Sequence, residues 1–301
     1  MQNKKERPVI LKPFNKKKID ELLQDWDKNK NKMLGYKLKK FPKLTECLDG
    51  IQKGLYIFAG VTGLGNTSLL ISLFLDIFKS NNNIFCIYIT LKDTEDDIYY
   101  KMLSCNTHKA EINDLKKMGY FKIIGDKKTY ENCDKSFNDF DLYTGKIALY
   151  GKETISSFDI LEKAIEHHKK ENQDKQVVVF LDPLNDVQMP SLGNSDLNIK
   201  NKIQKLRNLA NIKKIPLITT LEFFPKYNLD KAYNVANEKG FSDAEFFAFL
   251  AESEIEKIKY IENSPKTIKL KLIIKKNKFN QKKLINIDLK FDLCYAHIKE
   301  I

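Results

Sequence analysis

The sequence predicts an α/β fold, in which a mostly parallel, helix-flanked sheet carries additional antiparallel strands at its C-terminal end. Two observations lead to this prediction. From residue 51 onward, short apolar runs typical of buried strands alternate with amphipathic stretches typical of helices. Near the end of the chain, strand-like runs follow one another without a helical pattern between them, which is typical of antiparallel additions.

The elements can be placed in order along the chain. Strands are expected at 55–59, 84–90, 147–150, 177–181, 216–221, 246–250, 268–274 and 284–289. Helices are expected at 69–77, 95–105, 156–170 and 197–212. Residues 1–40 are lysine-rich with one short amphipathic stretch at 19–26, so we expect a basic arm or linker there and the α/β domain at 41–301.

Composition excludes several classes of protein. Hydrophobic residues make up 42% of the 301 residues and charged residues 31%, which is typical of a soluble globular protein. The first residues are polar, so no signal peptide is expected. The longest apolar stretch, 69–78, is too short for a membrane span and contains Asp76. Five scattered cysteines without a C-x-x-C pattern predict a reduced, cytoplasmic protein without a zinc site.

The formal net charge of +12 favours a polyanionic partner such as nucleic acid. Of the 52 lysines and arginines, however, only Arg7 and Arg207 are arginines, and this bias is equally consistent with an AT-rich coding sequence. Two segments are locally basic: 1–43, with fourteen Lys and Arg against five acids, and 257–290, with eleven Lys against two acids. The second also alternates Ile and Leu with Lys, as a strand with a solvated lysine face does.

Residues 60–68, Gly-Val-Thr-Gly-Leu-Gly-Asn-Thr-Ser, match the phosphate-binding loop pattern G-x-x-x-x-G-K-[ST] except at one position. Asn66 stands where the pattern has the lysine that pairs with the β- and γ-phosphates. The loop also lies between a predicted strand and a predicted helix, as the pattern requires. The candidate nucleotide-binding residues of the loop are Gly60, Gly63, Gly65, Asn66, Thr67 and Ser68.

A second motif lies downstream. The apolar run 177–181 ends in Asp182, and an acid at the end of a buried strand is where proteins with such a loop hold Mg²⁺. Thr67 and Asp182 are therefore the candidate Mg²⁺ ligands, provided that a nucleotide binds. With Asn66 in the loop, the sequence leaves open whether ATP or ADP with Mg²⁺ still binds.

The order of these motifs and the residues around them resemble the ATPase domain of DnaB-type replicative helicases, a branch of the RecA-like fold. The resemblance implies a RecA-like fold, a ring of six subunits with nucleotide at their interfaces, and a role in DNA replication. It extends over about residues 34–300 and rests on Phe-Pro-Lys-Leu at 41–44, Gly-Ile-Gln-Lys-Gly at 50–54, Leu-Asp-Pro-Leu at 181–184, Asp-Ala-Glu followed by an apolar strand at 243–250, and Ile-Ile-Lys-Lys-Asn-Lys at 273–278.

The chain departs from the family at the catalytic positions. The resemblance places Lys92 at the catalytic glutamate, Glu222 at or near a glutamine sensor and Lys278 at the arginine finger. An arginine finger alone contributes about 10³–10⁵ in rate, so the resemblance implies an inactive or very weak ATPase. Lys92 either supplies the charge that Asn66 lacks or lies in a vestigial pocket. Arg207 is one of two residues that could serve as a relocated finger.

The resemblance also indicates where single-stranded DNA would bind. Lys226, Tyr227 and Lys231 follow the strand at 216–221 and could contact phosphates and stack on a base. In the resembled family two central loops face the DNA. The first begins after the strand at 216–221, and Lys200 and Lys202 belong to the second, at 190–202. Alternatively, Phe223, Phe224 and Tyr227 pack together at the edge of the sheet and do not contact DNA.

Three interpretations therefore remain open. The first is a catalytically degenerate, DnaB-like binding and assembly module in DNA replication, which assembles with itself, with a helicase or with another replication protein. The second is an active ATP-dependent DNA helicase with an atypical phosphate-binding loop. The third is a repurposed RecA-like scaffold that binds no nucleic acid and whose basic charge is compositional.

Overall fold

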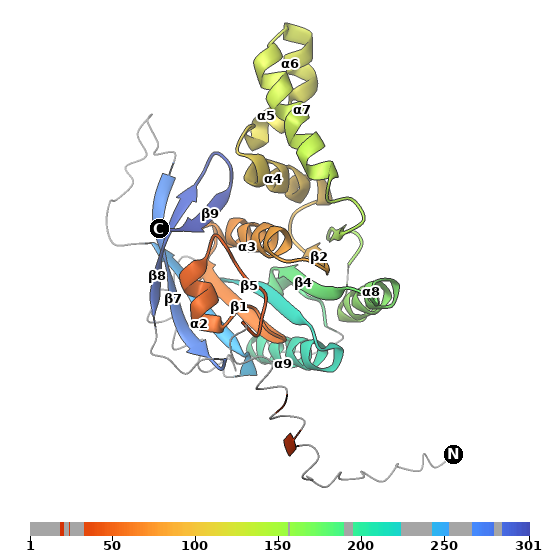
Figure 1. Ribbon diagram of the computed structural model, residues 1–301, viewed down its shortest axis with the longest axis vertical. Coiled ribbons are helices and arrows are strands. Elements are labelled where there is room, and N and C mark those ends of the chain that lie inside the picture. The colour runs from red at the N-terminus through yellow and green to blue at the C-terminus, as the bar shows by residue number, and fades with distance from the viewer. Residues whose placement is uncertain are drawn as a thin grey trace. The chain divides into compact units, whose positions relative to one another are not determined.

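A single mixed sheet organises the domain in the computed structural model (Figure 1), which describes residues 19–20, 24, 33–155, 157–189, 195–223, 243–252, 267–279 and 285–301. Within these residues the nine strands lie in the order β3-β2-β4-β5-β1-β6-β7-β8-β9. Strands β3 to β6 in this order pair in parallel, and β6 to β9 pair antiparallel. The predicted parallel sheet with antiparallel strands at its C-terminal end is confirmed. The strands are β1 (Gly54–Val61), β2 (Ile84–Thr90), β3 (Ile147–Tyr150), β4 (Gln176–Asp182), β5 (Pro216–Phe223), β6 (Phe246–Glu252), β7 (Thr267–Asn277), β8 (Asn286–Asp292) and β9 (His297–Glu300).

Burial explains why the strands have different sequence patterns. β2 is buried at every position and β1 at all but its last, so both appear as unbroken apolar runs covered on two faces. β8 instead alternates exposed and buried residues, because only one of its faces is covered. In β7 the side chains of Leu270, Leu272 and Ile274 are buried, whereas Lys269 is exposed. The solvated lysine face predicted there is present at Lys269.

Helices cover both faces of the sheet (Figure 1). One buried cluster joins one face of the sheet to α2, α3 and α4 and contains Tyr56 and Phe58 of β1. The other joins the opposite face to α8 and α9 and contains Leu55 and Ile57 of the same strand. The helices are α2 (Pro42–Leu48), α3 (Asn66–Ser80), α4 (Glu95–Thr107), α5 (Ile112–Lys116), α6 (Met118–Ile124), α7 (Lys127–Asp141), α8 (Phe158–Glu171) and α9 (Ser195–Lys213), with a 3-10 turn at Leu184–Asp186.

The compact domain begins before residue 41. The chain divides into one compact unit at 1–34 and another at 35–301, and the boundary at 40/41 stays a prediction. Gly35 donates its amide to Asp49 and Tyr36 pairs with Ile51, while Leu38 is fully buried in the core. Most of the stretch 19–26, expected to be an amphipathic helix, lies outside the described residues.

Four of the five cysteines, Cys47, Cys86, Cys105 and Cys133, are buried, and Cys294 is partly exposed. In the part of the chain that the structure describes, no helix is long and apolar enough to cross a membrane.

Candidate functional site

The phosphate-binding loop lies at the carboxyl edge of the parallel strands. It leaves β1 at Val61 and enters α3 at Asn66, and β1 has β5 and then β4 beside it. Ligands of open α/β sheets bind outside the carboxyl ends of such strands. Gly63 and Gly65 have φ values of 89° and 100°, which residues with a side chain rarely adopt. Glycine at these two positions therefore allows the loop to adopt this backbone conformation.

The side chain of Asn66 is folded back into the loop. It is 3% exposed, and its Nδ2 donates to the carbonyl of Val61 at 3.2 Å. Its Oδ1 is buried without a hydrogen-bond partner among the described residues, and a Cβ placed on Gly60 would lie 2.2 Å from that atom. The amide at position 66 thus holds the loop together instead of extending toward a phosphate.

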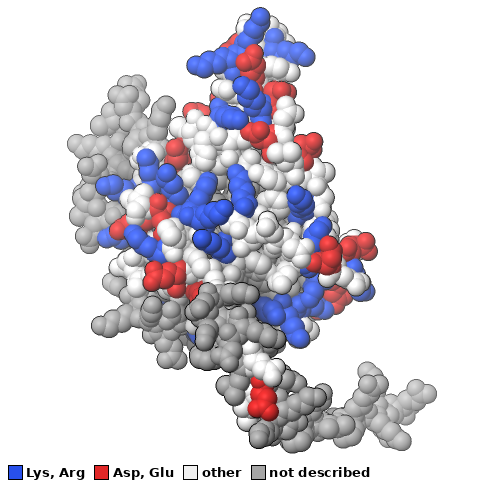
Figure 2. Space-filling view, viewed as in Figure 1, with Lys and Arg blue, Asp and Glu red and all other residues white. Residues whose placement is uncertain are grey.

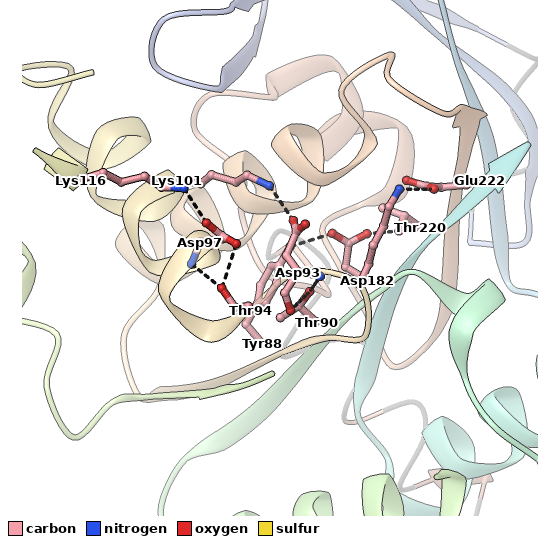
Figure 3. A network of polar contacts seen from close by, with 11 residues as sticks. Tyr88, Thr90, Asp93, Thr94, Asp97, Lys101, Lys116, Asp182, Thr220 and Glu222 are labelled. Carbon is pink, nitrogen blue, oxygen red and sulfur yellow. Dashed lines mark hydrogen bonds and ion pairs between the residues drawn. The ribbon is translucent and has the colours of Figure 1, made fainter. Parts of the chain in front are cut away.

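Asp182 lies at the end of β4, next to the loop. The hydroxyl of Thr220 donates to its Oδ1, and that of Tyr88 donates to its Oδ2 at 3.3 Å (Figure 3). Burial raises the pKa of the carboxyl, and hydrogen bonds from Thr220 and Thr67 lower it by less. The structure therefore brings together Thr67 and Asp182, the two predicted Mg²⁺ ligands.

The donor set fits Mg²⁺ only in part. A hydroxyl and a carboxylate are the oxygen ligands that Mg²⁺ uses together with substrate phosphates. Among the described residues, no group of three or more acids, histidines or cysteines could hold a metal ion. Thr67 and Asp182 would therefore hold Mg²⁺ only together with the phosphates of a nucleotide.

Lys92 and Glu222, which the sequence predicts to stand at catalytic positions of the family, form an ion pair. Lys92 Nζ lies 2.8 Å from Glu222 Oε2, and this hydrogen bond raises the pKa of Lys92. The Oδ1 of Asn185 accepts from the main-chain amide of Glu222 at 2.8 Å, and its Nδ2 donates to the main-chain carbonyl of Glu222 at 3.0 Å. These two bonds hold the backbone of Glu222 in place. Because β4 lies between β2 and β5, the pair spans the end of β4, where Asp182 lies.

This pair bears on the charge that Asn66 lacks. An ammonium that already neutralises a carboxylate can approach a phosphate only by breaking that pair. The surroundings are also acidic: Glu222 and Asp93 both raise the pKa of Asp182, and burial together with Glu222 raises the pKa of Asp186. The geometry does not favour the hypothesis that Lys92 replaces the missing loop lysine.

Lys278 and Arg207 lie at the opposite edge of the sheet from the loop. The amide of Lys278 donates to the carbonyl of Glu245 at 3.0 Å, and Arg207 Nε lies 3.0 Å from Glu245 Oε1. Glu245 also accepts from the amide of Leu55, at the start of β1. The loop follows the other end of β1, so neither cation is placed beside the loop of its own chain.

The predicted DNA-contacting residues are only partly described. Lys226, Tyr227 and Lys231 lie outside the described residues. Lys200 is exposed, whereas Lys202 is 6% exposed and donates its Nζ to the carbonyl of Asn185. Of this set, Lys200 is the described side chain that faces solvent.

Four site residues were not found from the sequence: Tyr88, Thr220, Asn185 and Phe291. Thr220 is one residue beyond Thr219, which pairs with Leu181, so strand register places its hydroxyl next to Asp182. Phe291 comes from β8, and a Cβ on Gly65 would lie 2.7 Å from its Cε1. No spacing in the sequence signals these contacts, because each depends on the order of strands in the sheet.

Several solved structures have the same fold. One, described as an ATPase domain, is 13% identical, with a TM-score of 0.76, over 95% of this chain and 98% of that one. The structure of a DnaB-like replicative helicase, described with its interactions with primase, is 13% identical with a TM-score of 0.76, over 93% of this chain and 67% of that one. A KaiC-like protein from the hyperthermophilic archaeon Pyrococcus horikoshii has a TM-score of 0.55 at 15% identity, over 88% of this chain and 98% of that one.

Sequence comparison assigns the family. No curated protein sequence matches the chain. The family described as the DnaB-like helicase C-terminal domain matches residues 38–300, which is most of the chain and contains both the phosphate-binding loop and Asp182. The chain belongs to the DnaB-like helicase C-terminal domain family.

Proposed function

We propose that this protein is a catalytically degenerate member of the DnaB-like family, a binding and assembly module of DNA replication that does not hydrolyse ATP efficiently. The ion pair between Lys92 and Glu222 is the observation that carries the proposal. A catalytic glutamate must accept a proton from the attacking water or orient that water. Lys92 is instead a cation whose pKa is raised further by Glu222, so it cannot accept that proton at neutral pH.

Magnitudes support the same conclusion. Loss of a general base costs about 10²–10⁴ in rate, and loss of an arginine finger costs about 10³–10⁵. Losses within one site are not additive. The nearby carboxylates of Glu222 and Asp93 are each bound to a lysine, Lys92 and Lys101, which makes them poor substitute bases. Asn66 stands in place of the loop lysine, the third charged group of such a site, and its side chain is buried inside the loop.

Assembly is the part of the family's behaviour that the remaining surfaces support. Lys278 lies at the edge of the sheet opposite the loop of its own chain, so it would reach such a loop only on a second copy or on a helicase subunit. One solved relative of this fold is a DnaB-like replicative helicase whose interactions with primase are known. We therefore propose that the module assembles with itself or with replication proteins, with single-stranded DNA as the nucleic acid bound.

The first experiment is calorimetric titration of the protein with Mg-ATP and with ADP, followed by a phosphate-release assay on the same sample with and without single-stranded DNA. We expect release no faster than that of the Asp182→Ala variant. DNA-stimulated release that Asp182→Ala abolishes would instead establish an active helicase with an unusual loop. DNA binding is measured as a function of salt, because phosphate contacts weaken steeply as salt rises.

A restoration experiment tests the cause. The triple variant Asn66→Lys, Lys92→Glu, Glu222→Gln returns three positions to the family pattern. We expect ATP affinity to rise roughly tenfold, as one charged hydrogen bond to phosphate predicts, and release to stay low until Lys278→Arg is added. The matched control is Asn66→Lys alone. If the control equals the triple variant in ATP affinity, and also in release once Lys278→Arg is added to both, the Lys92–Glu222 pair does not limit the site.

A further inference from the structure

A hollow of about 640 Å³ lies away from the phosphate-binding loop, between the approach to α2, the end of α4 and strands β8 and β9. None of residues 60–68 lines it. Lysines gather over β9 on the face shown in Figure 2. The side chains that matter for its chemistry are Lys39, Lys40, Lys43, Lys290, Lys299, His108, His297, Asp292 and Glu300.

The charge of the hollow is uneven. Five lysines line it against two acids, and no ion pair involves any of these lysines within the described residues. Lys43 Nζ donates to the main-chain oxygen of Ile301, which also lines the hollow, at 3.0 Å. Both acids already bind main-chain amides. Glu300 accepts from the amides of Lys43 and Leu44 at 2.8 and 2.9 Å, and Asp292 accepts from the amide of Cys294 at 3.1 Å. Five lysines against two acids leave the side chains that line the hollow with a net formal charge of +3.

Two histidines keep the inner wall of the hollow neutral. Lys40 Nζ lies 3.1 Å from Nε2 of His297, and the ring of His297 packs 4.3 Å from that of His108. Burial, followed by the charge of Lys40, lowers the pKa of His297 to about 3. A neutral imidazole accepts a hydrogen bond from Lys40 and leaves its charge in place, so the hollow stays cationic at neutral pH.

The two basic segments found in the sequence meet here. Lys39, Lys40 and Lys43 end the segment 1–43, and Lys290 ends the segment 257–290. Four lysines from segments that are distant in the sequence therefore line one hollow, together with Lys299. A bias of composition alone would scatter lysines over the surface without gathering them around a concave site.

We propose that this hollow is a second anion site that binds a compact polyphosphate of nucleotide size without Mg²⁺. Its volume lies within the range of small-ligand pockets, about 300–1,000 Å³. Multiple ammonium groups from separate segments bind several phosphate oxygens through charge-assisted hydrogen bonds, and they take the place of the divalent cation that a nucleotide otherwise brings. A nucleic-acid strand needs cations along an extended groove, whereas these lysines surround a single hollow.

The experiment uses inorganic tripolyphosphate as the probe, titrated calorimetrically into the full chain without Mg²⁺. The test variant is Lys39→Ala, Lys290→Ala, Lys299→Ala, because these three lysines are exposed. The matched control is Lys127→Ala, Lys128→Ala, Lys135→Ala, which removes three exposed lysines of α7. We expect affinity to fall at least tenfold in the test variant and less than twofold in the control and in Asp182→Asn.

ATP and AMP titrations then separate the polyphosphate chain from the nucleoside, and we expect ATP to bind and AMP to bind at least tenfold more weakly. Equal losses in test and control variants would mean unspecific attraction and would overturn the proposal. So would binding of a single-stranded oligonucleotide but not of tripolyphosphate. Thermal unfolding of each variant checks its fold, and the single variant Lys299→Glu, expected to weaken binding at least tenfold, provides a second measurement. Because Asp182→Asn alters only the loop site, this outcome is independent of whether the protein hydrolyses ATP.

Discussion

At the scale of single residues, Lys92 and Glu222 should be energetically coupled. Lys92 is 46% exposed in its side chain and Glu222 is 16% exposed, so solvent screens the pair and a coupling of about 0.5–1 kcal/mol is expected. A double-mutant cycle of Lys92→Met and Glu222→Gln, followed by chemical denaturation, measures it. The control cycle is Lys109→Met with Asp139→Asn, a pair with both side chains more than 40% exposed, for which a smaller coupling is expected. Coupling at Lys92 no larger than in the control would mean that the contact contributes nothing.

His297 provides a prediction of pH dependence. Its pKa is lowered from 6.5 to about 3, so the folded state keeps the imidazole neutral while the unfolded state takes up a proton below pH 6.5. The stability is present above pH 6.5 and is lost as the pH falls toward 3, by about 2 kcal/mol between pH 7 and pH 5. His297→Gln should reduce this loss, whereas the exposed control His167→Gln should preserve it. Denaturation curves at the two pH values decide, and equal losses in both variants would contradict the assignment.

The candidate site residues could be named from the sequence, but their contacts with one another could not. The loop pattern and the acid after a buried strand predicted Asn66 and Asp182 at one site. That Lys92 and Glu222 would meet could not be predicted, because they are far apart in the sequence and the strand order that brings them together is a property of the whole sheet. For the same reason, Tyr88 and Thr220 escaped notice as partners of Asp182.

At the scale of elements, the phosphate-binding loop and β8 support each other. Alanine at Gly63 or Gly65 meets backbone strain, with φ values of 89° and 100°. A Cβ at Gly63 meets nothing within 4 Å, but at Gly65 it would lie 2.7 Å from the ring of Phe291. Gly65→Ala should therefore lower the free energy of unfolding by about 1–3 kcal/mol more than Gly63→Ala. Urea denaturation of both variants tests this. Equal losses would mean that the ring moves aside at no cost.

Element prediction succeeded where burial was continuous. The run at 84–90 matches β2, which is buried at every position, because strands buried in a parallel sheet are apolar throughout. Helices α5 to α7, over 112–141, were not predicted. In α7 only Cys133, Ser136 and Phe140 are buried, so its sequence is mostly polar and lacks a wide apolar stripe. β9, with four residues, is too short to carry a pattern.

At the scale of the whole molecule, charge is arranged differently at each site. The carboxyl edge of the sheet contains acids around Asp182, with Lys92 already paired. The hollow beside β9 contains lysines that no ion pair among the described residues neutralises. The net charge of +12 alone could not distinguish these two environments, since it sums over both. Attraction of a polyphosphate is therefore expected to be stronger at the hollow than at the loop.

The contacts of Leu38 predict that residues before 41 contribute to the stability of the domain. Leu38 is fully buried, and Thr45 Oγ1 binds both its amide and its carbonyl, at 3.0 and 2.9 Å. A chain that begins at Gly35 keeps these contacts, whereas a chain that begins at Phe41 loses them. Burial of one leucine contributes about 2–3 kcal/mol and each hydrogen bond about 1 kcal/mol, so the shorter chain should be less stable by at least about 3 kcal/mol. Chemical denaturation of residues 35–301 and 41–301 measures the difference, with the full chain as control. Equal stability of the two truncated chains would place the boundary at 40/41, where the sequence alone had put it.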